Sequence, residues 1–296
     1  MPEAAIMNWN LAAMPTGQRY TVNGIEMHVV IAGSGPDVLL LHGFPDSHEL
    51  WRHQIPALVA AGFRVIAPDL RGFGLTEIPK DGVAAYRAEN LVADVVSLLD
   101  VLGVAKVRLV AHDWGAAIGW LVAIRHPERI DRYVAISVGH PTAYARGGFK
   151  QKLMGWYILM FQLRGFAEWL FSSNDFALFE RLSGFPQELP NWRADLVRLG
   201  RLTAAMSYYR ANIALILPFD RATSQSRSWE FGVRRMSLWS SGRWSIPRNS
   251  ARPAGVMSAS MVSVTGCLSK PPIASIPCFL SICAKETPTN QVSDEE

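Results

Sequence analysis

The segment Val107–Ala117 (VRLVAHDWGAA) places a carboxylate at a position suited to nucleophilic chemistry. An apolar, strand-like run leads into His112-Asp113-Trp114-Gly115, and a helical pattern begins at once. Sharp strand-to-helix turns of this kind present a nucleophile, usually serine, at the carboxyl edge of a sheet. A carboxylate there suits attack on an electrophilic sp³ carbon, with an alkyl-ester intermediate. The simpler interpretation is that Asp113 only caps the helix that follows it.

Two further motifs follow other apolar runs. His42-Gly43-Phe44-Pro45 comes after the third predicted strand and, taken alone, indicates only a turn. The segment 69–74 (DLRGFG) comes after the fourth predicted strand, and we expect its Arg/Asp pair to fix this glycine-bent loop. We therefore assign a structural role to the second loop.

In this order and spacing, HGFP, DLRGFG and HDWG resemble the α/β-hydrolase superfamily, and specifically its epoxide hydrolases, over about residues 18–217. The resemblance implies that Asp113 opens a small apolar epoxide and that water then releases a diol. It also implies an oxyanion hole made by the backbone N–H groups of Phe44 and Trp114. The residues expected to support this hole are His42, Gly43, Pro45 and Gly115. No cofactor and no metal are expected.

Two related families share parts of this pattern. Haloalkane dehalogenases keep the Asp-Trp turn but usually carry Asn or Glu where Phe44 stands, and fluoroacetate dehalogenases usually carry Arg where Trp114 stands. Both departures favour the epoxide hydrolases. A haloalkane dehalogenase, with Trp114 as a halide ligand, is the first alternative. A catalytically dead relic or a binding protein that keeps only the pocket is the second.

The resemblance also implies two tyrosines in a helical cap that hydrogen-bond the epoxide oxygen. Tyr157, in WYILMFQ (156–162), matches the first tyrosine segment, and Tyr209, in SYYRAN (207–212), matches the second. A phenol with a pKa of about 10 can stabilise the leaving oxygen by hydrogen bonding or proton donation. Tyr208 is the competing assignment, and plain packing is the alternative for any cap tyrosine.

A late histidine, oriented by an acid, is the part of the family's site that this chain lacks. The chain has 7 histidines, and the last of them is His140. His112 precedes the nucleophile, and adjacent strand residues face opposite ways, so it is a poor substitute. His140, at the end of the sixth strand, is a weak one. The catalytic histidine is therefore unassigned, and we expect the chain to alkylate but hardly to turn over.

The last quarter of the chain departs from the family pattern. After Asp220 neither a strand period nor a helix period persists, and between residues 221 and 280 Glu230 is the single acid. A shifted reading frame behind Met261–Leu268 permits Gly-x-Gly-His-Trp-Leu, the form of the late histidine segment. We interpret 218–296 as an expected return to the core that is irregular or out of frame.

Charge and composition exclude other classes of protein. The 296 residues carry a formal net charge of +4 and are 49% hydrophobic, which excludes disorder for most of the chain. Residues 1–220 carry 20 Lys/Arg against 20 Asp/Glu, so no basic nucleic-acid face is expected. All three cysteines lie in the tail, without zinc or disulfide spacing. With no signal peptide and no apolar run of roughly 18 residues, we expect a cytoplasmic protein, not bound to a membrane, of undetermined oligomeric state.

The predicted elements define an α/β-hydrolase fold. The first 140 residues alternate short strands and helices, which predicts a mostly parallel sheet with helices on both faces. The predicted strands are a hairpin over Arg19–Ile31, then Val38–His42, Arg64–Ala67, Val107–Ala111 and Arg132–Ser137, with helices over 48–61, 88–103 and 115–126. Helical spacing over 141–217 predicts a helical cap packed over the sheet. The core is thus 1–140, and the strands after the cap are doubtful.

Overall fold

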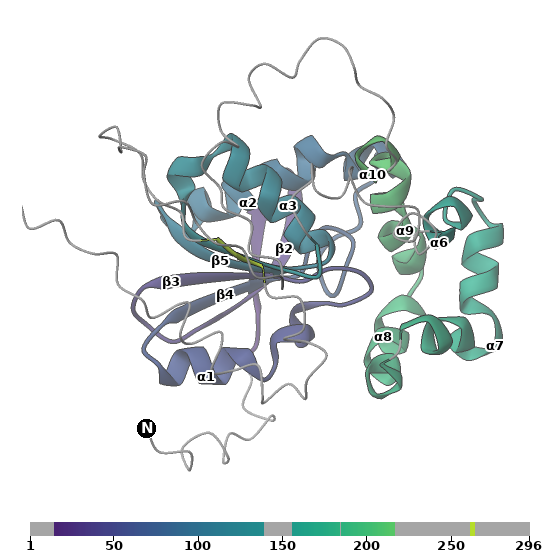
Figure 1. The fold of residues 1–296 in the computed structure, drawn as a ribbon, viewed down its shortest axis with the longest axis horizontal. Helices are drawn as coiled ribbons and strands as arrows, with labels where there is room; N and C mark the ends of the chain where they lie inside the picture. The colour runs from purple at the N-terminus through teal and green to yellow at the C-terminus, as the bar shows by residue number, and fades with distance from the viewer. Residues whose placement is uncertain (1–14, 139–155, 184, 217–260, 264–296) are drawn as a thin grey trace, which may run out of the picture.

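The computed structural model describes residues 15–138, 156–183, 185–216 and 261–263. A seven-stranded sheet forms its centre, in the order β1-β2-β4-β3-β5-β6-β7 (Figure 1). The strands are β1 Gln18–Val22, β2 Ile25–Ala32, β3 Asp37–Leu41, β4 Arg64–Pro68, β5 Val107–His112, β6 Ile130–Ile136 and β7 Met261–Ser263. Neighbouring strands from β4 to β7 run parallel, whereas β2 is antiparallel to both β1 and β4.

The N-terminal hairpin forms where the sequence predicts it. Asn23 and Gly24 both have positive φ values, of 46° and 78°, and Val22 pairs with Ile25 across this turn. Asparagine and glycine are the residues that tolerate this conformation best, which is why the pair predicts a hairpin. The Asn23 side chain also donates a hydrogen bond of 2.8 Å to Asp94, so the turn is tied to the helix behind it.

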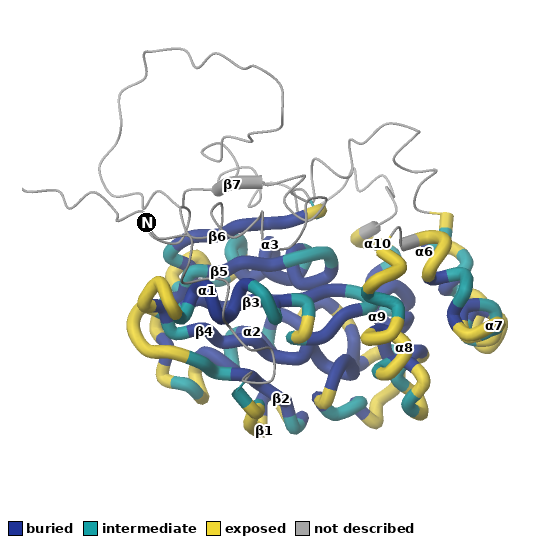
Figure 2. The backbone as a smooth tube through the Cα atoms, turned by 90° about the horizontal axis from the view of Figure 1, so that it is seen from below, coloured by how far each residue is buried: buried dark blue, intermediate teal, exposed yellow. Residues whose placement is uncertain are grey.

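Alternate residues of the parallel strands enter two separate cores. The helices that cover the sheet are α1 Gln54–Ala60, α2 Ala88–Val101 and α3 Trp114–Arg125. Val38 and Leu40 of β3 lie in the core that contains α1, whereas Leu39 and Leu41 lie in the core that contains α2 and α3. Side chains alternate along a strand, so the two sets face opposite sides. Figure 1 shows α1 on one face and α2 and α3 on the other, and Figure 2 shows that the central strands are buried. The predicted α/β-hydrolase fold is confirmed.

The described residues between Trp156 and Ile216 are mostly helical, and they do not lie over a face of the sheet. Their helices are α6 Trp156–Met160, α7 Phe166–Ser183, α8 Leu189–Leu196, α9 Arg201–Ala211 and α10 Ile213–Ile216. In Figure 1 this group stands beside one end of the sheet. It contacts the loops that follow β3 and β4, through bonds such as Trp192 to Asp46 and Tyr208 to Arg71. The cap therefore covers the carboxyl edge, because both faces are already occupied by α1, α2 and α3.

Two smaller differences from the predictions concern short elements. The helix expected over 48–61 is divided into a 3-10 turn, η3 His48–Trp51, and α1. Three further 3-10 turns are η4 Gly82–Tyr86, η5 Pro127–Arg129 and η6 Pro186–Glu188. No element was predicted after the cap, yet β7 pairs parallel with β6, with Tyr133 opposite Met261. A strand of three residues is too short to show an alternating pattern, which explains why the sequence did not predict it. The rest of 218–296, and residues 139–155 with His140, lie outside the described residues.

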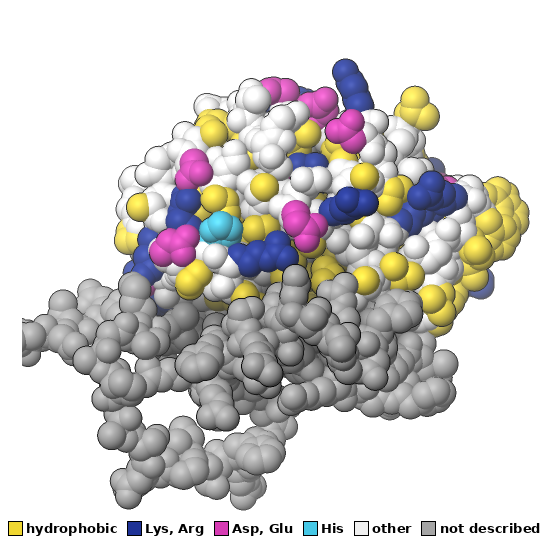
Figure 3. Space-filling view, turned by 90° about the horizontal axis from the view of Figure 1, so that it is seen from above, with side chains coloured by type: hydrophobic (Ala, Val, Ile, Leu, Met, Phe, Trp, Pro, Cys, Tyr) yellow, Lys and Arg dark blue, Asp and Glu magenta, His cyan; other side chains and the backbone are white. Residues whose placement is uncertain are grey.

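The surface carries charges of both signs. On the face in Figure 3, the described Lys and Arg side chains are interspersed with Asp and Glu and do not form one basic patch. Among the described residues, no helix has the length and apolar character needed to cross a membrane.

Candidate active site

Asp113 lies at the junction of β5 and α3, in a backbone conformation that few side chains adopt. Its φ and ψ are 50° and −120°, and it is the residue that precedes the first turn of α3. A non-glycine residue in such a region is strained, and strain of this kind is common at functional sites. Its side chain makes no capping hydrogen bond to α3, so the alternative of a simple helix cap is not what the structure contains.

The loop after β3 supplies a main-chain donor to this carboxylate. The Phe44 N–H donates to Asp113 Oδ1 over 2.8 Å. Trp114 is the first residue of α3, so its N–H is one of the free donors at the start of a helix. Both groups expected to form the oxyanion hole therefore lie beside Asp113. Phe44 is followed by Pro45 through a cis peptide bond.

Two glycines allow the loop and the turn to approach this closely. A Cβ at Gly43 would lie 2.5 Å from both Cβ and Oδ1 of Asp113, and 2.7 Å from Trp114 N. A Cβ at Gly115 would lie 2.3 Å from the carbonyl oxygen of His42. No larger residue fits either position without a shift of the backbone. Both glycines thus permit close contact between the main chains of the loop and of the turn.

His42 is a structural histidine. Its Nδ1 bonds to the Gly43 carbonyl oxygen and its Nε2 accepts the Leu70 N–H, each over 2.9 Å. Complete burial lowers the pKa of His42 to about 4, so the ring is neutral near pH 7. Both ring nitrogens are engaged, which leaves none for proton transfer.

The two predicted cap tyrosines lie together above the elbow. The rings of Tyr157 on α6 and Tyr209 on α9 are 6.0 Å apart, and the ring of Tyr209 is 5.2 Å from that of Trp114. Burial, the negative charge of Asp113 and the Tyr157 side chain raise the pKa of Tyr209 well above its usual value, against an opposing hydrogen bond with Trp114. The phenol of Tyr209 therefore keeps its proton near Asp113 at neutral pH.

Tyr208, the competing assignment, also has its ring 5.5 Å from that of Trp114, but its hydroxyl is engaged elsewhere. It is fully buried, and its hydroxyl donates to the Arg71 carbonyl oxygen over 2.8 Å. Asn212, one turn further along, donates to the carbonyl oxygens of Tyr208 and Tyr86, each over 2.8 Å. These bonds attach α9 to the core. The Tyr208 hydroxyl is thus engaged in holding α9 on the core.

His112, the histidine next to the nucleophile in the sequence, is not placed to act as a base toward Asp113. His112 ends β5, and within the described residues its buried Nδ1 has no hydrogen-bond partner. Burial lowers the pKa of His112, and the negative charge of Asp113 only partly opposes this. No other His in the described part of the chain contacts Asp113 through a hydrogen bond or an ion pair.

One buried acid beside the site was missed by sequence reasoning. Asp46 Oδ1 accepts the indole N–H of Trp192, on α8, over 2.6 Å. Burial raises the pKa of Asp46 to about 7, and the hydrogen bond from Trp192 opposes this rise in part. Its signal in the sequence is an acid directly after Gly43-Phe44-Pro45, but its partner lies 146 residues away. Asp46 therefore joins the loop of the oxyanion donor to the cap.

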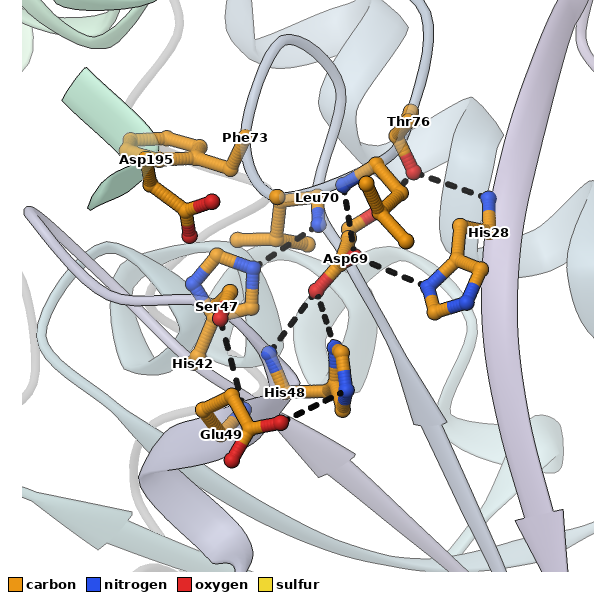
Figure 4. Close-up of polar contacts among 12 residues, drawn as sticks. His28, His42, Ser47, His48, Glu49, Asp69, Leu70, Phe73, Thr76 and Asp195 are labelled. Carbon is orange, nitrogen blue, oxygen red and sulfur yellow. Dashed lines mark hydrogen bonds and ion pairs between the residues drawn. The ribbon is translucent and has the colours of Figure 1, made fainter. Parts of the chain in front are cut away.

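The DLRGFG loop is fixed by two separate clusters and not by one Arg/Asp pair. Arg71 binds Asp94 of α2 through two hydrogen bonds, of 2.6 and 2.5 Å. Asp69, fully buried, binds His28 and His48 instead (Figure 4). The predicted structural role is correct, but each member of the motif has a partner elsewhere in the chain.

Comparisons with known proteins agree with this geometry. The family model described as "alpha/beta hydrolase fold" matches residues 36–215. "Epoxide hydrolase 2" of Siraitia grosvenorii is 39% identical over 225 residues, covering 64% of this chain and 71% of the relative. The crystal structure of epoxide hydrolase VrEH1 from Vigna radiata is 36% identical with a TM-score of 0.59, covering 70% of this chain and 74% of that one. A Bacillus megaterium epoxide hydrolase in complex with an inhibitor is 30% identical with a TM-score of 0.61, covering 69% and 78%.

The sheet, the strained elbow and the loop after β3 define an α/β hydrolase. The relatives of known sequence and structure narrow the class further. The chain belongs to the epoxide hydrolase family of α/β hydrolases, as its three motifs predicted.

Proposed function

We propose that this hydrolase opens an epoxide by attack of Asp113 on a ring carbon. A carboxylate oxygen bonds to the carbon, the carbon–oxygen bond of the ring breaks, and the freed oxygen takes the electron pair and a proton. Tyr157 and Tyr209 hold this oxygen, and the N–H groups of Phe44 and Trp114 stabilise the oxyanion when water cleaves the ester. The single observation that carries the proposal is the position of Tyr209, whose ring lies 5.2 Å from that of Trp114, the residue next to Asp113 on the strained elbow.

One observation favours an epoxide over a haloalkane. The leaving oxygen of an epoxide needs a proton donor, and two phenols lie on this side of the site. The substrate we infer is a small apolar epoxide, because Phe44 is surrounded by the rings of Phe161, Phe179 and Tyr209, at 5.4 to 5.6 Å.

We further infer that this chain completes only the first half-reaction. A core over 1–140 and a cap over 141–217 provide the nucleophile and the tyrosines, while the water-activating histidine would belong to 218–296 as an in-frame sequence. The nucleotide sequence behind codons 218–270 tests this inference directly, because a neighbouring frame must encode Gly-His-Trp.

Intact-mass analysis after incubation with styrene oxide tests the alkylation itself. We expect one added substrate mass, located on Asp113 by peptide mapping, and none in Asp113→Asn, which preserves shape and removes the nucleophile. Halide release from a chloroalkane, without epoxide adducts, would support the dehalogenase alternative. Equal epoxide binding by both forms, with no adduct in either, would identify a binding protein.

A further inference from the structure

The loop that carries the Phe44 N–H is hydrogen-bonded at both ends to the segment that follows β4. It begins after His42, whose Nε2 accepts the Leu70 N–H over 2.9 Å. It ends at His48, whose backbone N–H and Nδ1 each bond to Asp69 Oδ1 over 2.8 Å. Asp69 and Leu70 are consecutive residues after β4. Residues 43–47 therefore lie between two histidines, His42 and His48, which are hydrogen-bonded to the consecutive residues Leu70 and Asp69.

The Asp69 carboxylate is fully used as a hydrogen-bond acceptor. Besides the two bonds from His48, its Oδ2 accepts His28 Nδ1 and the Leu75 N–H, each over 2.9 Å (Figure 4). Four N–H donors thus occupy the lone pairs of one buried carboxylate. Both imidazoles use Nδ1 as a donor, so neither nitrogen is free to bind a cation. The cluster of His28, His48 and Asp69 is an anchor for the chain and not a vacant metal site.

Every charged or titratable neighbour of His48 can be named. Asp69 faces its Nδ1, Glu49 lies 3.5 Å from its Nε2, the ring of His28 is 5.1 Å away, and His42 lies behind the same carboxylate. Burial opposes a charge on His48, but the hydrogen bonds to Asp69 and Glu49 outweigh it and raise its pKa to about 10. Burial raises the pKa of Asp69 too, yet its bonds to His28 and His48 reverse this and hold it well below its usual range.

The two ends of the loop therefore differ in charge. His42 is neutral and His48 is a cation throughout the neutral range. A charge-assisted hydrogen bond is shorter and about twice as strong as a neutral one. Loss of the His48 proton would weaken the attachment at that end only, without touching Asp113 or either tyrosine.

We propose that His48 is a positioning residue: through the bonds of its backbone N–H and Nδ1 to Asp69, it holds residues 43–47 so that the Phe44 N–H faces Asp113. For its kinetic consequence the inference rests on the proposed function. His48 does not contact the reacting atoms and acts through the Phe44 amide. The matched variant is His48→Asn, because an asparagine side chain can place a neutral N–H donor near the position of Nδ1 but does not titrate.

Amide hydrogen exchange of Phe44, measured by NMR on the full-length protein, tests the positioning without any chemistry. In wild type at pH 8 we expect a protected Phe44 amide. In His48→Ala we expect protection to fall by about tenfold, the effect of losing one charge-assisted hydrogen bond, and in His48→Asn to fall less. In wild type, protection should also fall between pH 8 and 10.5, whereas in His48→Asn it should not. If His48→Ala does not fold, this difference in pH dependence between wild type and His48→Asn still decides the matter.

The rate of alkylation by styrene oxide gives the second readout. We expect the wild-type rate to decline between pH 8 and 10.5 and the His48→Asn rate to decline less, since the tyrosines are common to both. Equal Phe44 protection in wild type and His48→Ala, or identical pH profiles for wild type and His48→Asn, would overturn the proposal. Absence of any adduct in wild type would refute the proposed function instead. The exchange data would still show whether His48 positions the Phe44 amide.

Discussion

The core half and the cap half of the site are built on different principles. The core half consists of main-chain groups, and Gly43 and Gly115 bring these groups too close together to admit any side chain. The cap half consists of two phenols placed by ring contacts of 5 to 6 Å and by hydrogen bonds of neighbouring residues. A substitution that separates the main-chain groups removes their contact altogether, whereas a substitution at a ring contact weakens it in part. Substitutions in the core half should therefore abolish alkylation, and those in the cap half should lower its rate by intermediate amounts.

The largest effect should come from supplying the missing part of the core half. We predict that replacing residues 218–296 with the C-terminal segment of an epoxide hydrolase relative converts a chain that stops at the ester into one that turns over. Diol formed per chain, followed over time, measures this: at most one for the present chain and many for the chimaera. A chimaera that forms the ester and never releases it would show that a missing histidine is the wrong explanation.

Gly43→Ala should nearly abolish alkylation. The new Cβ would lie 2.5 Å from Asp113 Cβ and displace the loop that donates the Phe44 N–H. The same Cβ would displace the Asp113 carboxylate, which must reach the ring carbon, and a misplacement of about 1 Å can lower a rate by about 100-fold. The rate of adduct formation by mass spectrometry is the measurement. Gly24→Ala, which strains the hairpin turn at a φ of 78° but meets no atom within 4 Å, is the control for strain alone: it should lower stability and still alkylate at the wild-type rate. A fully active Gly43→Ala would refute the main-chain account of the core half.

In the cap half, two adjacent tyrosines should give opposite results. Tyr209→Phe removes a proton donor that faces the site, so alkylation should slow by about 100-fold with little change in stability. Tyr208→Phe removes the bond to the Arg71 carbonyl oxygen, so the free energy of unfolding should fall by about 1 kcal/mol while alkylation changes little. Adduct rates and urea denaturation of both variants give the comparison. If the two variants behave alike, the division of work between Tyr208 and Tyr209 is wrong.

The smallest effect on the reaction is expected at Asp46, which joins the core half of the site to the cap half. Folded Asp46 keeps its proton up to about pH 7, whereas an unfolded aspartate releases it at about pH 4. Between these values the folded state binds more protons, so stability should fall as the pH rises from about 4 to 7. Asp46→Asn should remove this part of the pH dependence, so that its Tm changes less between about pH 4 and 7 than the Tm of wild type. The exposed Asp81→Asn is the control and should follow wild type. A profile for Asp46→Asn that matches wild type would refute the assignment.

The sequence predicted the core half well because local patterns determine it. An apolar run, a glycine and a helical pattern are enough to place Asp113 at an elbow, and the structure has this elbow at β5 and α3. The hairpin at Asn23-Gly24 was predictable for the same reason. The helices on both faces of the sheet were predictable because strands and helices alternate along the first 140 residues.

The contacts that hold the site could not be predicted, because they join distant parts of the chain. Asp46 meets Trp192, and His48 and His28 meet at Asp69, only after the sheet and the cap have formed. Tyr157 and Tyr209 were assigned by resemblance alone, since no local pattern shows which face of a cap helix meets the core. The strand β7 was missed because three residues carry no period.

The donor that faces Asp113 is a peptide N–H. The hydrogen bond to Asp113 and the choice of side chain at position 44 are therefore independent of each other. Any residue except proline at position 44 would offer the same N–H, so the side chain there is free to change without loss of the donor. That side chain, Phe44, packs against Phe161, Phe179 and Tyr209 of the cap. Position 44 is therefore a place where substrate preference can evolve, or be engineered, while the reaction stays the same.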